Sequence, residues 1–215
     1  MDHGFWHDRW ESGRIGFHEG RPNPLLVKHF PVLSVPEHGR VFVPLCGKTL
    51  DIGWLLSNGC RVAGVELSEL AITQLFEELG LEPTMFDHGG LKRYSATDID
   101  MFVGDVFALT QDLLGSIDAV FDRAAFVALP GHLRAAYAPH ITHITGKAPQ
   151  LLITFEYDTS LLDGPPFSIQ GEELEQRYGD SYALSTLAMD GVAGGFKGHN
   201  ARERVWFLKP LQTQE

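Results

Sequence analysis

Cysteine is scarce in this chain of 215 residues, which has only Cys46 and Cys60. The two residues flank a predicted helix, and nothing in their spacing suggests a disulfide, so they fit a reducing cytoplasm. No apolar run reaches about eighteen residues, and no charged segment followed by an apolar one opens the chain. The sequence therefore predicts a cytoplasmic protein that neither spans a membrane nor is secreted.

Positive charge is also limited, with 17 Lys and Arg against 28 Asp and Glu and a net charge of -11. Nucleic-acid binding generally needs a basic surface, so no nucleic-acid partner is expected. The ten histidines include two pairs with helical spacing, His3 with His7 and His140 with His143. Neither pair has a cysteine or carboxylate pattern that would specify a metal site, and we expect no metal.

The length and the 44% hydrophobic content suit one compact domain, which we expect to span residues 1–215. Strand-like and helix-like segments alternate, a pattern typical of an α/β fold with a mostly parallel sheet covered on both faces. Strands are expected at 41–44, 61–66, 92–95, 99–103, 117–122, 151–157, 182–189 and 204–208. Helices are expected at 22–33, 50–58, 70–79, 133–144 and 171–178.

A nucleotide-binding pattern runs from Arg40 to Ser68. It contains a strand, a glycine turn, a helix and a second strand that ends in a carboxylate, within about thirty residues. Glu66 lies nineteen residues after Gly47, close to the interval at which an acidic residue binds ribose hydroxyls in Rossmann-like folds. A carboxylate can accept one hydrogen bond from each of two adjacent hydroxyls. Glu66 is therefore predicted to bind the ribose of an adenosine-bearing cofactor.

The turn after the first strand argues against a phosphate chain. Between Pro44 and Lys48 it has a single glycine, Gly47, whereas dinucleotide sites use G-x-G-x-x-G. A P-loop would need glycine at position 42, which is Phe42. A cofactor that carries adenosine but no phosphates fits this turn better, and S-adenosylmethionine is the common cofactor of that kind. Leu45 and Gly47 are expected to line its methionine portion.

A second acidic residue, Asp105, follows the strand predicted at 99–103. It is placed to accept a hydrogen bond from the adenine amino group, with Val106 beside the ring. The alternative is an ordinary turn, since acidic residues after a glycine often form one.

Four segments, in this order, resemble the motifs of the thiopurine S-methyltransferase family: Val43–Lys48, Gly64–Ser68, Phe121–Leu129 and Gly164–Phe167. The opening segments Phe5–Trp10 and Gly16–His18 resemble the start of that family, so the likeness runs from about residue 5 to about residue 208. It implies a Rossmann-like class I methyltransferase domain. Its sheet would be mostly parallel and seven-stranded with an antiparallel C-terminal pair, and residues 1–35 would form a helical lid.

The resemblance also implies roles for four residues. Trp6 and Phe17 would belong to a lid that stacks on cofactor or substrate, and Arg123 would bind the cofactor carboxylate. Arg134 would lie by the substrate, where a cation favours the thiolate. The structural alternatives are aromatic anchoring of the N-terminus, a buried ion pair for Arg123 and a surface position for Arg134.

The segment Gly164–Phe167 is expected to form the wall of the cofactor cleft opposite the N-terminal lid, with Phe167 facing the cleft.

The function implied is an S-adenosylmethionine-dependent S-methyltransferase. It would act on thiopurines or related aromatic and heterocyclic thiols and leave S-adenosylhomocysteine. A monomer is the default expectation for a compact domain with no evident exposed apolar stripe. Methyl transfer from a sulfonium is an in-line displacement that needs positioning and exclusion of water more than a strong general base. Two alternatives stay open. One is methylation of selenium or tellurium oxyanions, sulfide or small aliphatic thiols, and the other is a non-enzymatic adenosine-binding protein on this fold.

Overall fold

The computed structural model describes residues 3–16, 18–192 and 194–212. Their strands form one nine-stranded sheet in the order β3-β4-β5-β2-β1-β6-β7-β9-β8. The strands are β1 (Arg40–Pro44), β2 (Arg61–Glu66), β3 (Thr84–Asp87), β4 (Lys92–Ala96), β5 (Ile99–Val103), β6 (Ala119–Arg123), β7 (Gln150–Tyr157), β8 (Tyr182–Gly191) and β9 (Ala201–Pro210).

The middle of the sheet is parallel and its two edges are antiparallel. Strands β5, β2, β1, β6 and β7 pair in parallel, as a doubly wound α/β fold requires. The predicted antiparallel C-terminal pair, β8 with β9, is confirmed. The described residues form nine strands, against the seven that the family resemblance implied and the eight segments expected along the sequence; β3 and β4 extend the sheet beyond β5. Strand β3 was missed because all its residues are exposed, so no apolar alternation marks it.

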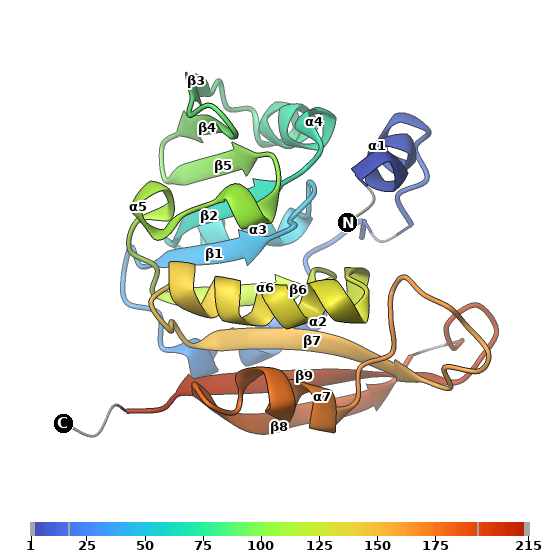
Figure 1. Cartoon of the computed structure of the whole chain (residues 1–215). Coiled ribbons are helices and arrows are strands. Elements are labelled where there is room, and N and C mark those ends of the chain that lie inside the picture. The colour runs from blue at the N-terminus through green and yellow to red at the C-terminus, as the bar shows by residue number, and fades with distance from the viewer. Residues whose placement is uncertain (1–2, 17, 193, 213–215) are drawn as a thin grey trace.

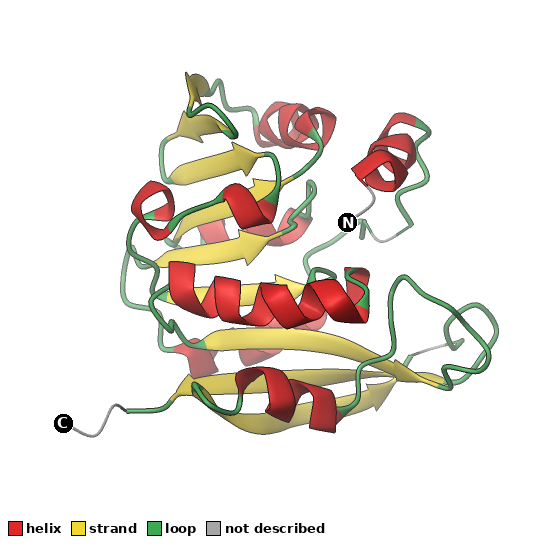
Figure 2. Cartoon of the chain, viewed as in Figure 1, coloured by secondary structure: helices red, strands yellow, loops and turns green. Residues whose placement is uncertain are grey.

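Helices cover both faces of the sheet (Figures 1 and 2). The α-helices are α1 (His3–Glu11), α2 (Pro24–His29), α3 (Leu50–Ser57), α4 (Glu69–Leu79), α5 (Gln111–Leu114), α6 (Gly131–Ile144) and α7 (Gly171–Tyr178), and the short 3-10 turns are η1 (Phe30–Leu33), η2 (Val106–Ala108) and η3 (Phe126–Ala128). Helices α6 and α7 pack on one apolar cluster, and α2, α3 and α4 pack on another. The sheet lies between two cores, so substitutions on alternate residues of one strand affect different cores.

Local sequence signals explain most helix ends. Thr49 caps α3 and Ser68 caps α4, each by accepting a backbone N–H, and Gly80 ends α4 with φ of 65°. The helix expected over 22–33 is instead divided into α2 and η1. Pro31 has no N–H to donate to the preceding turn, which accounts for the change from α-helix to 3-10 geometry.

The carboxyl ends of the parallel strands all meet on one side of the sheet. In Figure 1 the arrowheads of β1, β5 and β7 point toward the side on which α1 lies. Ligands of open α/β sheets bind outside these ends, in the crevice between diverging loops. None of the helices described here is long and apolar enough to cross a bilayer.

A buried carboxyl connects the centre of the sheet to α6. Asp122 on β6 is fully buried; its Oδ1 accepts the Phe126 N–H at 3.0 Å, and its Oδ2 accepts the Tyr137 hydroxyl at 2.8 Å. Burial raises the pKa of Asp122 from 3.8 to about 6, although these hydrogen bonds lower it. The interior therefore favours the protonated acid more than the unfolded chain does.

This buried acid makes stability depend on pH. Between 3.8 and about 6 the unfolded state loses the Asp122 proton first, so the contribution of Asp122 to stability declines as pH rises. The pKa difference corresponds to about 3 kcal/mol. We expect Asp122→Asn to remove this decline, as measured by chemical denaturation across that pH range. The exposed Asp112→Asn is the control and should keep it; an unchanged pH slope in Asp122→Asn would contradict the assignment.

Candidate functional site

A pocket of about 490 Å³ opens at the carboxyl edge of the sheet. Its walls come from the N-terminal segment, from the loops after β1, β2, β5 and β6, and from the segments around the end of β7 and the β8–β9 connection. This volume lies within the range of small-molecule sites, and the position is where open α/β sheets bind ligands.

The pocket brings together most of the predicted site residues. Those lining it are Trp6, Leu45, Gly47, Glu66, Asp105, Val106 and Arg123. Phe17 lies outside the described residues. Arg134 is not among the lining residues.

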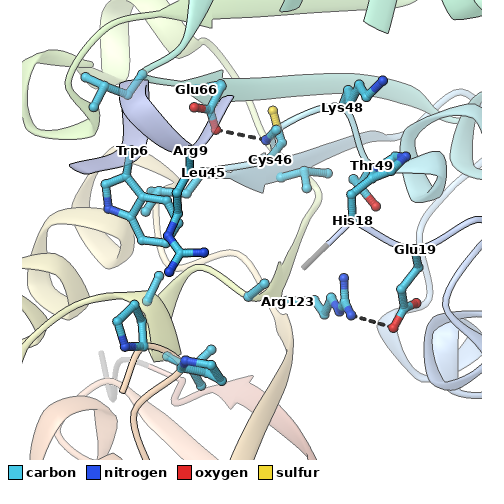
Figure 3. Close-up of a pocket in the computed structure, with 18 of the residues that line it drawn as sticks. Trp6, Arg9, His18, Glu19, Leu45, Cys46, Lys48, Thr49, Glu66 and Arg123 are labelled. Carbon is cyan, nitrogen blue, oxygen red and sulfur yellow. Dashed lines mark hydrogen bonds and ion pairs between the residues drawn. The ribbon is translucent and has the colours of Figure 1, made fainter. Parts of the chain in front are cut away.

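Glu66 ends β2 and is buried at the top of the pocket in Figure 3. Its Oε2 accepts the Gly47 N–H at 2.9 Å, and its Oε1 accepts the Ser68 N–H at 2.9 Å. Burial raises the pKa of Glu66, while the N–H groups of Ser68 and Gly47 lower it. Each carboxylate oxygen can accept more than one hydrogen bond, so both can still bind a ligand hydroxyl.

The turn after β1 brings the backbone close to α1. Leu45 and Gly47 both have positive φ, at 46° and 52°, and the Cys46 N–H donates to the Val65 carbonyl at 3.1 Å. A Cβ on Gly47 would lie only 2.8 Å from the Trp10 ring. Glycine is needed here both for its left-handed conformation and for the close approach of the buried indole.

Asp105 forms the turn considered as the alternative, and it also lies at the pocket. It caps the short turn η2 by accepting the Phe107 N–H at 3.0 Å, and it also lines the pocket. Its Oδ2 lies 3.2 Å from Nε2 of His3 on α1. Val106 beside it is buried, and its carbonyl lies 2.8 Å from Nε2 of His140. The cap holds Asp105 at the edge of the pocket.

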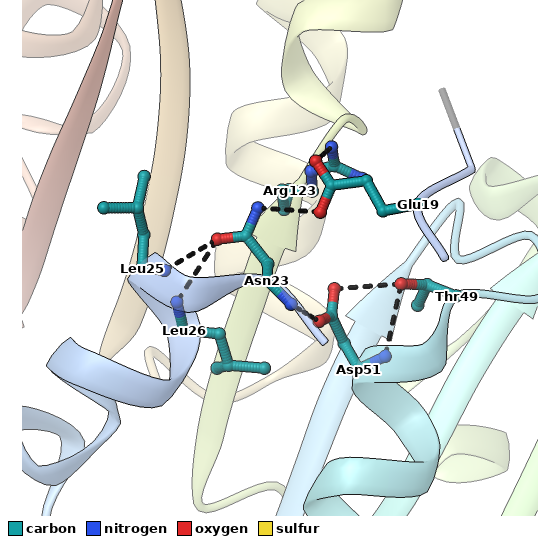
Figure 4. Close-up of polar contacts among 7 residues, drawn as sticks. All are labelled: Glu19, Asn23, Leu25, Leu26, Thr49, Asp51 and Arg123. Atoms are coloured by element: carbon teal, nitrogen blue, oxygen red, sulfur yellow. Dashed lines mark hydrogen bonds and ion pairs between the residues drawn. The ribbon is translucent and has the colours of Figure 1, made fainter. Parts of the chain in front are cut away.

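Arg123, at the end of β6, forms an ion pair with Glu19, with 2.5 Å between Nη2 and Oε1. Glu19 also accepts a hydrogen bond from Asn23 Nδ2 at 3.3 Å, and the Asn23 N–H donates to Asp51 Oδ1 at 2.6 Å. Figure 4 shows this chain of contacts continuing to Thr49. An ion pair, the alternative considered for Arg123, is thus present, and its acid is the half-buried Glu19. Arg123 lines the pocket at the same time.

Arg134 lies in the contact between α6 and α7. Its Nε and Nη2 donate to the two carboxylate oxygens of Glu173 at 2.7 and 2.9 Å, and Nη1 donates to the Leu129 carbonyl at 2.6 Å. Its guanidinium also faces the Phe167 ring at 5.5 Å. The acidic α7 supplies the partner, which the spacing on α6 alone does not reveal.

The loop from Gly164 to Phe167 forms a wall through its prolines only. Pro165 and Pro166 line the pocket, but Phe167 does not and packs against the core cluster on the α6 side. The Phe167 N–H donates to the Val127 carbonyl at 2.7 Å, which directs this residue inward. The expectation that Phe167 faces the cleft was wrong.

Several lining residues were missed from the sequence. Phe155 and Phe196 form an aromatic wall, with ring centroids 5.9 Å apart, and Tyr157 lies 6.0 Å from Phe196. Glu203 on β9 lines the same part of the pocket. Alternation along β9 would have placed Glu203 on the same face of the sheet as Val205. Which of the two faces meets the pocket, however, depends on how β9 pairs with β7.

Comparison with known proteins gives a consistent result. A family model described as thiopurine S-methyltransferase (TPMT) matches residues 1–207. A relative of that name from Xanthobacter autotrophicus is 54% identical, over 97% of this chain and 99% of its own length. Another from Gluconobacter oxydans is 47% identical, over 96% of this chain and 94% of its own length.

One solved structure shares the fold at low identity. It is a 1,6-didemethyltoxoflavin-N1-methyltransferase from Burkholderia thailandensis with bound 1,6-didemethyltoxoflavin and S-adenosylhomocysteine. It superposes with a TM-score of 0.66 at 15% identity, over 96% of this chain and 87% of its own. At this identity the likeness shows the fold alone.

The contact between Gly47 and Trp10 can be tested with a matched glycine. Gly80 also has positive φ, but a Cβ there would meet nothing within 4 Å. Gly80→Ala should cost about 1 to 2 kcal/mol of unfolding free energy from backbone strain alone. Gly47→Ala should cost more, because the methyl group displaces the indole. Chemical denaturation should show that this excess disappears in a Trp10→Ala background; equal losses in the two glycine variants would rule the contact out.

Proposed function

This chain belongs to the thiopurine S-methyltransferase family, as its motifs predicted, and we propose that it methylates the sulfur of thiopurines or related aromatic and heterocyclic thiols with S-adenosylmethionine. The observation that carries this proposal is that most of the predicted cofactor residues line one pocket together with an aromatic wall. The product of the cofactor is S-adenosylhomocysteine.

The pocket residues fit the polar groups of this cofactor. Glu66 offers remaining carboxylate lone pairs to the ribose, and Asp105 with Val106 would hold the adenine. The Arg123–Glu19 pair presents a cation and an anion, which suit the carboxylate and ammonium of the methionine end. When bound, S-adenosylmethionine supplies a methyl group activated by a sulfonium, so the protein mainly has to position the acceptor and exclude water.

The N-terminal segment would act as the lid. Helix α1 contributes Trp6, Arg9 and Trp10 to the pocket lining, and Figure 3 shows Trp6 and Arg9 beside the cavity opposite the Arg123–Glu19 pair. We propose that residues 1–35 form this lid within a single domain over 1–215. The hydrogen bonds of Asn23 with Asp51 and Glu19 would anchor it to the core.

The acceptor half of the pocket favours a flat apolar substrate. Phe155, Phe196, Pro165 and Pro166 surround it, and aromatic faces of this kind bind planar heterocycles by stacking. Sulfide or an oxyanion would make little use of such a wall. The contact of Arg134 with the thiolate stays a prediction. We propose a small-molecule thiol as the partner, a monomer, no nucleic acid, and a reducing cytoplasm, which fits the two unpaired, buried cysteines.

Removing the ribose ligand should weaken cofactor binding. We expect Glu66→Ala to lose about 1.5 to 3 kcal/mol of binding free energy for S-adenosylhomocysteine, typical of a hydrogen bond to a charged group. The measurement is calorimetric titration, with thermal unfolding as the test of folding. Glu69→Ala is a matched control, because Glu69 pairs with Lys92 at 2.8 Å and does not line the pocket. Unchanged affinity in a folded Glu66→Ala protein would remove the ribose assignment.

The aromatic wall predicts how substrates are ranked. Methyl transfer is measured with 6-mercaptopurine, thiophenol, sulfide and selenite, with Phe196→Ala against the exposed control Leu161→Ala. We expect Phe196→Ala to raise KM for the two aromatic substrates roughly three- to tenfold, the value of one aromatic contact, and to leave sulfide unchanged. If Phe196→Ala instead lost activity toward all four substrates together, the stacking role would be contradicted. Cofactor binding without turnover of any thiol would refute the enzymatic proposal.

A further inference from the structure

Glu203 lies beside the aromatic wall because of the strand register. It is half-buried on β9, directly opposite Phe155 on β7, and both residues line the pocket. Opposite residues of an antiparallel pair share a face, with Cβ atoms about 4.5–5.5 Å apart. The Phe155 ring lies 5.9 Å from that of Phe196. A heterocycle stacked on this wall would therefore meet the Glu203 carboxylate at its edge.

The Glu203 carboxylate differs from the other acids of the pocket in being unengaged. Across residues 3–16, 18–192 and 194–212 no hydrogen bond or ion pair reaches it within the usual distances. Glu66 accepts two backbone N–H groups, and Asp51 accepts the Asn23 N–H and the Thr49 hydroxyl. Glu19 holds Arg123 at 2.5 Å. Among these carboxylates, Glu203 has both oxygens available to a ligand.

The surroundings of Glu203 make it a better acceptor of a proton. Burial raises the pKa of Glu203; Arg123 on β6 lowers it, and the negative charges of Glu19 and Asp190 raise it. Asp190 is its neighbour across β8 and is exposed. The three charges that shift the pKa of Glu203 thus come from β6, from β8 and from the segment before α2. One of these charges is positive and two are negative. A site with this balance disfavours a second anion next to Glu203 and favours a hydrogen-bond donor.

His18 also lines the pocket and could in principle accept a proton. Burial, and next the charge of Lys48, lower its pKa. Figure 3 shows His18 beside Lys48 and Thr49, at the turn after β1, while the aromatic wall belongs to β7 and the β8–β9 connection. Its position therefore suits the methionine end of the cofactor and not the acceptor.

On the basis of the proposed function, we propose that Glu203 makes this enzyme selective for heterocyclic thiones, which carry a ring N–H next to the C=S group. Its carboxylate accepts the hydrogen bond of that N–H and takes the proton as the sulfur is methylated. The N–H bond breaks, its electron pair moves into the ring, and a pair on sulfur forms the new S–CH3 bond. The bond from the methyl group to the sulfonium breaks with its pair remaining on the cofactor sulfur. The protonated Glu203 then releases its proton to water.

This role predicts opposite effects for two kinds of acceptor. A thione gives Glu203 a hydrogen bond to a charged acceptor, which is stronger than one between neutral groups. An aromatic thiolate has no N–H and brings a negative charge toward the carboxylate. The S-methylated product has lost the N–H as well, so it should bind more weakly than the thione.

The test is calorimetric titration of the protein saturated with S-adenosylhomocysteine, with 6-mercaptopurine, S-methyl-6-mercaptopurine and thiophenol near neutral pH. Glu203→Gln should weaken binding of 6-mercaptopurine about tenfold, the difference between charged and neutral acceptors. It should leave the S-methylated product unchanged and leave thiophenol binding unchanged or stronger. Glu203→Asp keeps the charge and should preserve the order of the three ligands.

Asp190→Asn is the matched control, since it removes the neighbouring carboxylate without changing the pocket lining. It should not weaken 6-mercaptopurine binding. Each variant is first shown to bind S-adenosylhomocysteine like the wild type. Equal changes for all three ligands, or none, in Glu203→Gln would overturn the role of Glu203 even if thiols are methylated. Failure of the wild type to methylate any thiol would instead refute the proposed function, whatever the variants bind.

Discussion

The geometry of the pocket depends on the Glu66 carboxylate. Its two oxygens accept the N–H groups of Gly47 and Ser68, one in the turn after β1 and one at the start of α4. Burying a carboxylate is costly, and these two hydrogen bonds offset part of that cost while holding two loops at a defined separation. The same side chain that would bind the ribose therefore also shapes the crevice. Its structural and binding roles are compatible because each oxygen has more than one lone pair.

A second polar network attaches the N-terminal segment to this crevice. Asn23 caps α2, donates its backbone N–H to Asp51 and donates its side-chain amide to Glu19, which pairs with Arg123. Buried polar groups linked in this way favour a single arrangement of the segment, because a group left without a hydrogen-bond partner would carry an uncompensated desolvation cost. The segment before β1 is thus part of the pocket wall and not an appendage. Trp10 against Gly47 adds an apolar contact to the same attachment.

The sequence predictions that proved correct were mainly those based on signals between residues close together in the chain. Caps, glycine turns and apolar runs predicted β2 and α7 with their ends and α4 to within one residue, because those signals act within a few residues. Glu66, Gly47 and Asp105 were placed at the pocket because the carboxyl ends of parallel strands meet at one edge. Strand β3 and the inward packing of Phe167 were not foreseen. The first has no buried face, and the second depends on a backbone hydrogen bond to Val127.

The sequence by itself determined the α/β order, the glycine turn without a phosphate-binding pattern, and the family through ordered motifs. The first two are properties of residues close together in the chain, so periodicity and spacing reveal them, whereas the family follows from the resemblance of the motifs. Only the tertiary structure decided that Arg123 pairs with Glu19, that Arg134 turns to Glu173, and that Glu203 comes next to Phe155. Each of these contacts joins distant segments, and the choice among several acids and arginines depends on burial and strand register. No local pattern encodes that choice.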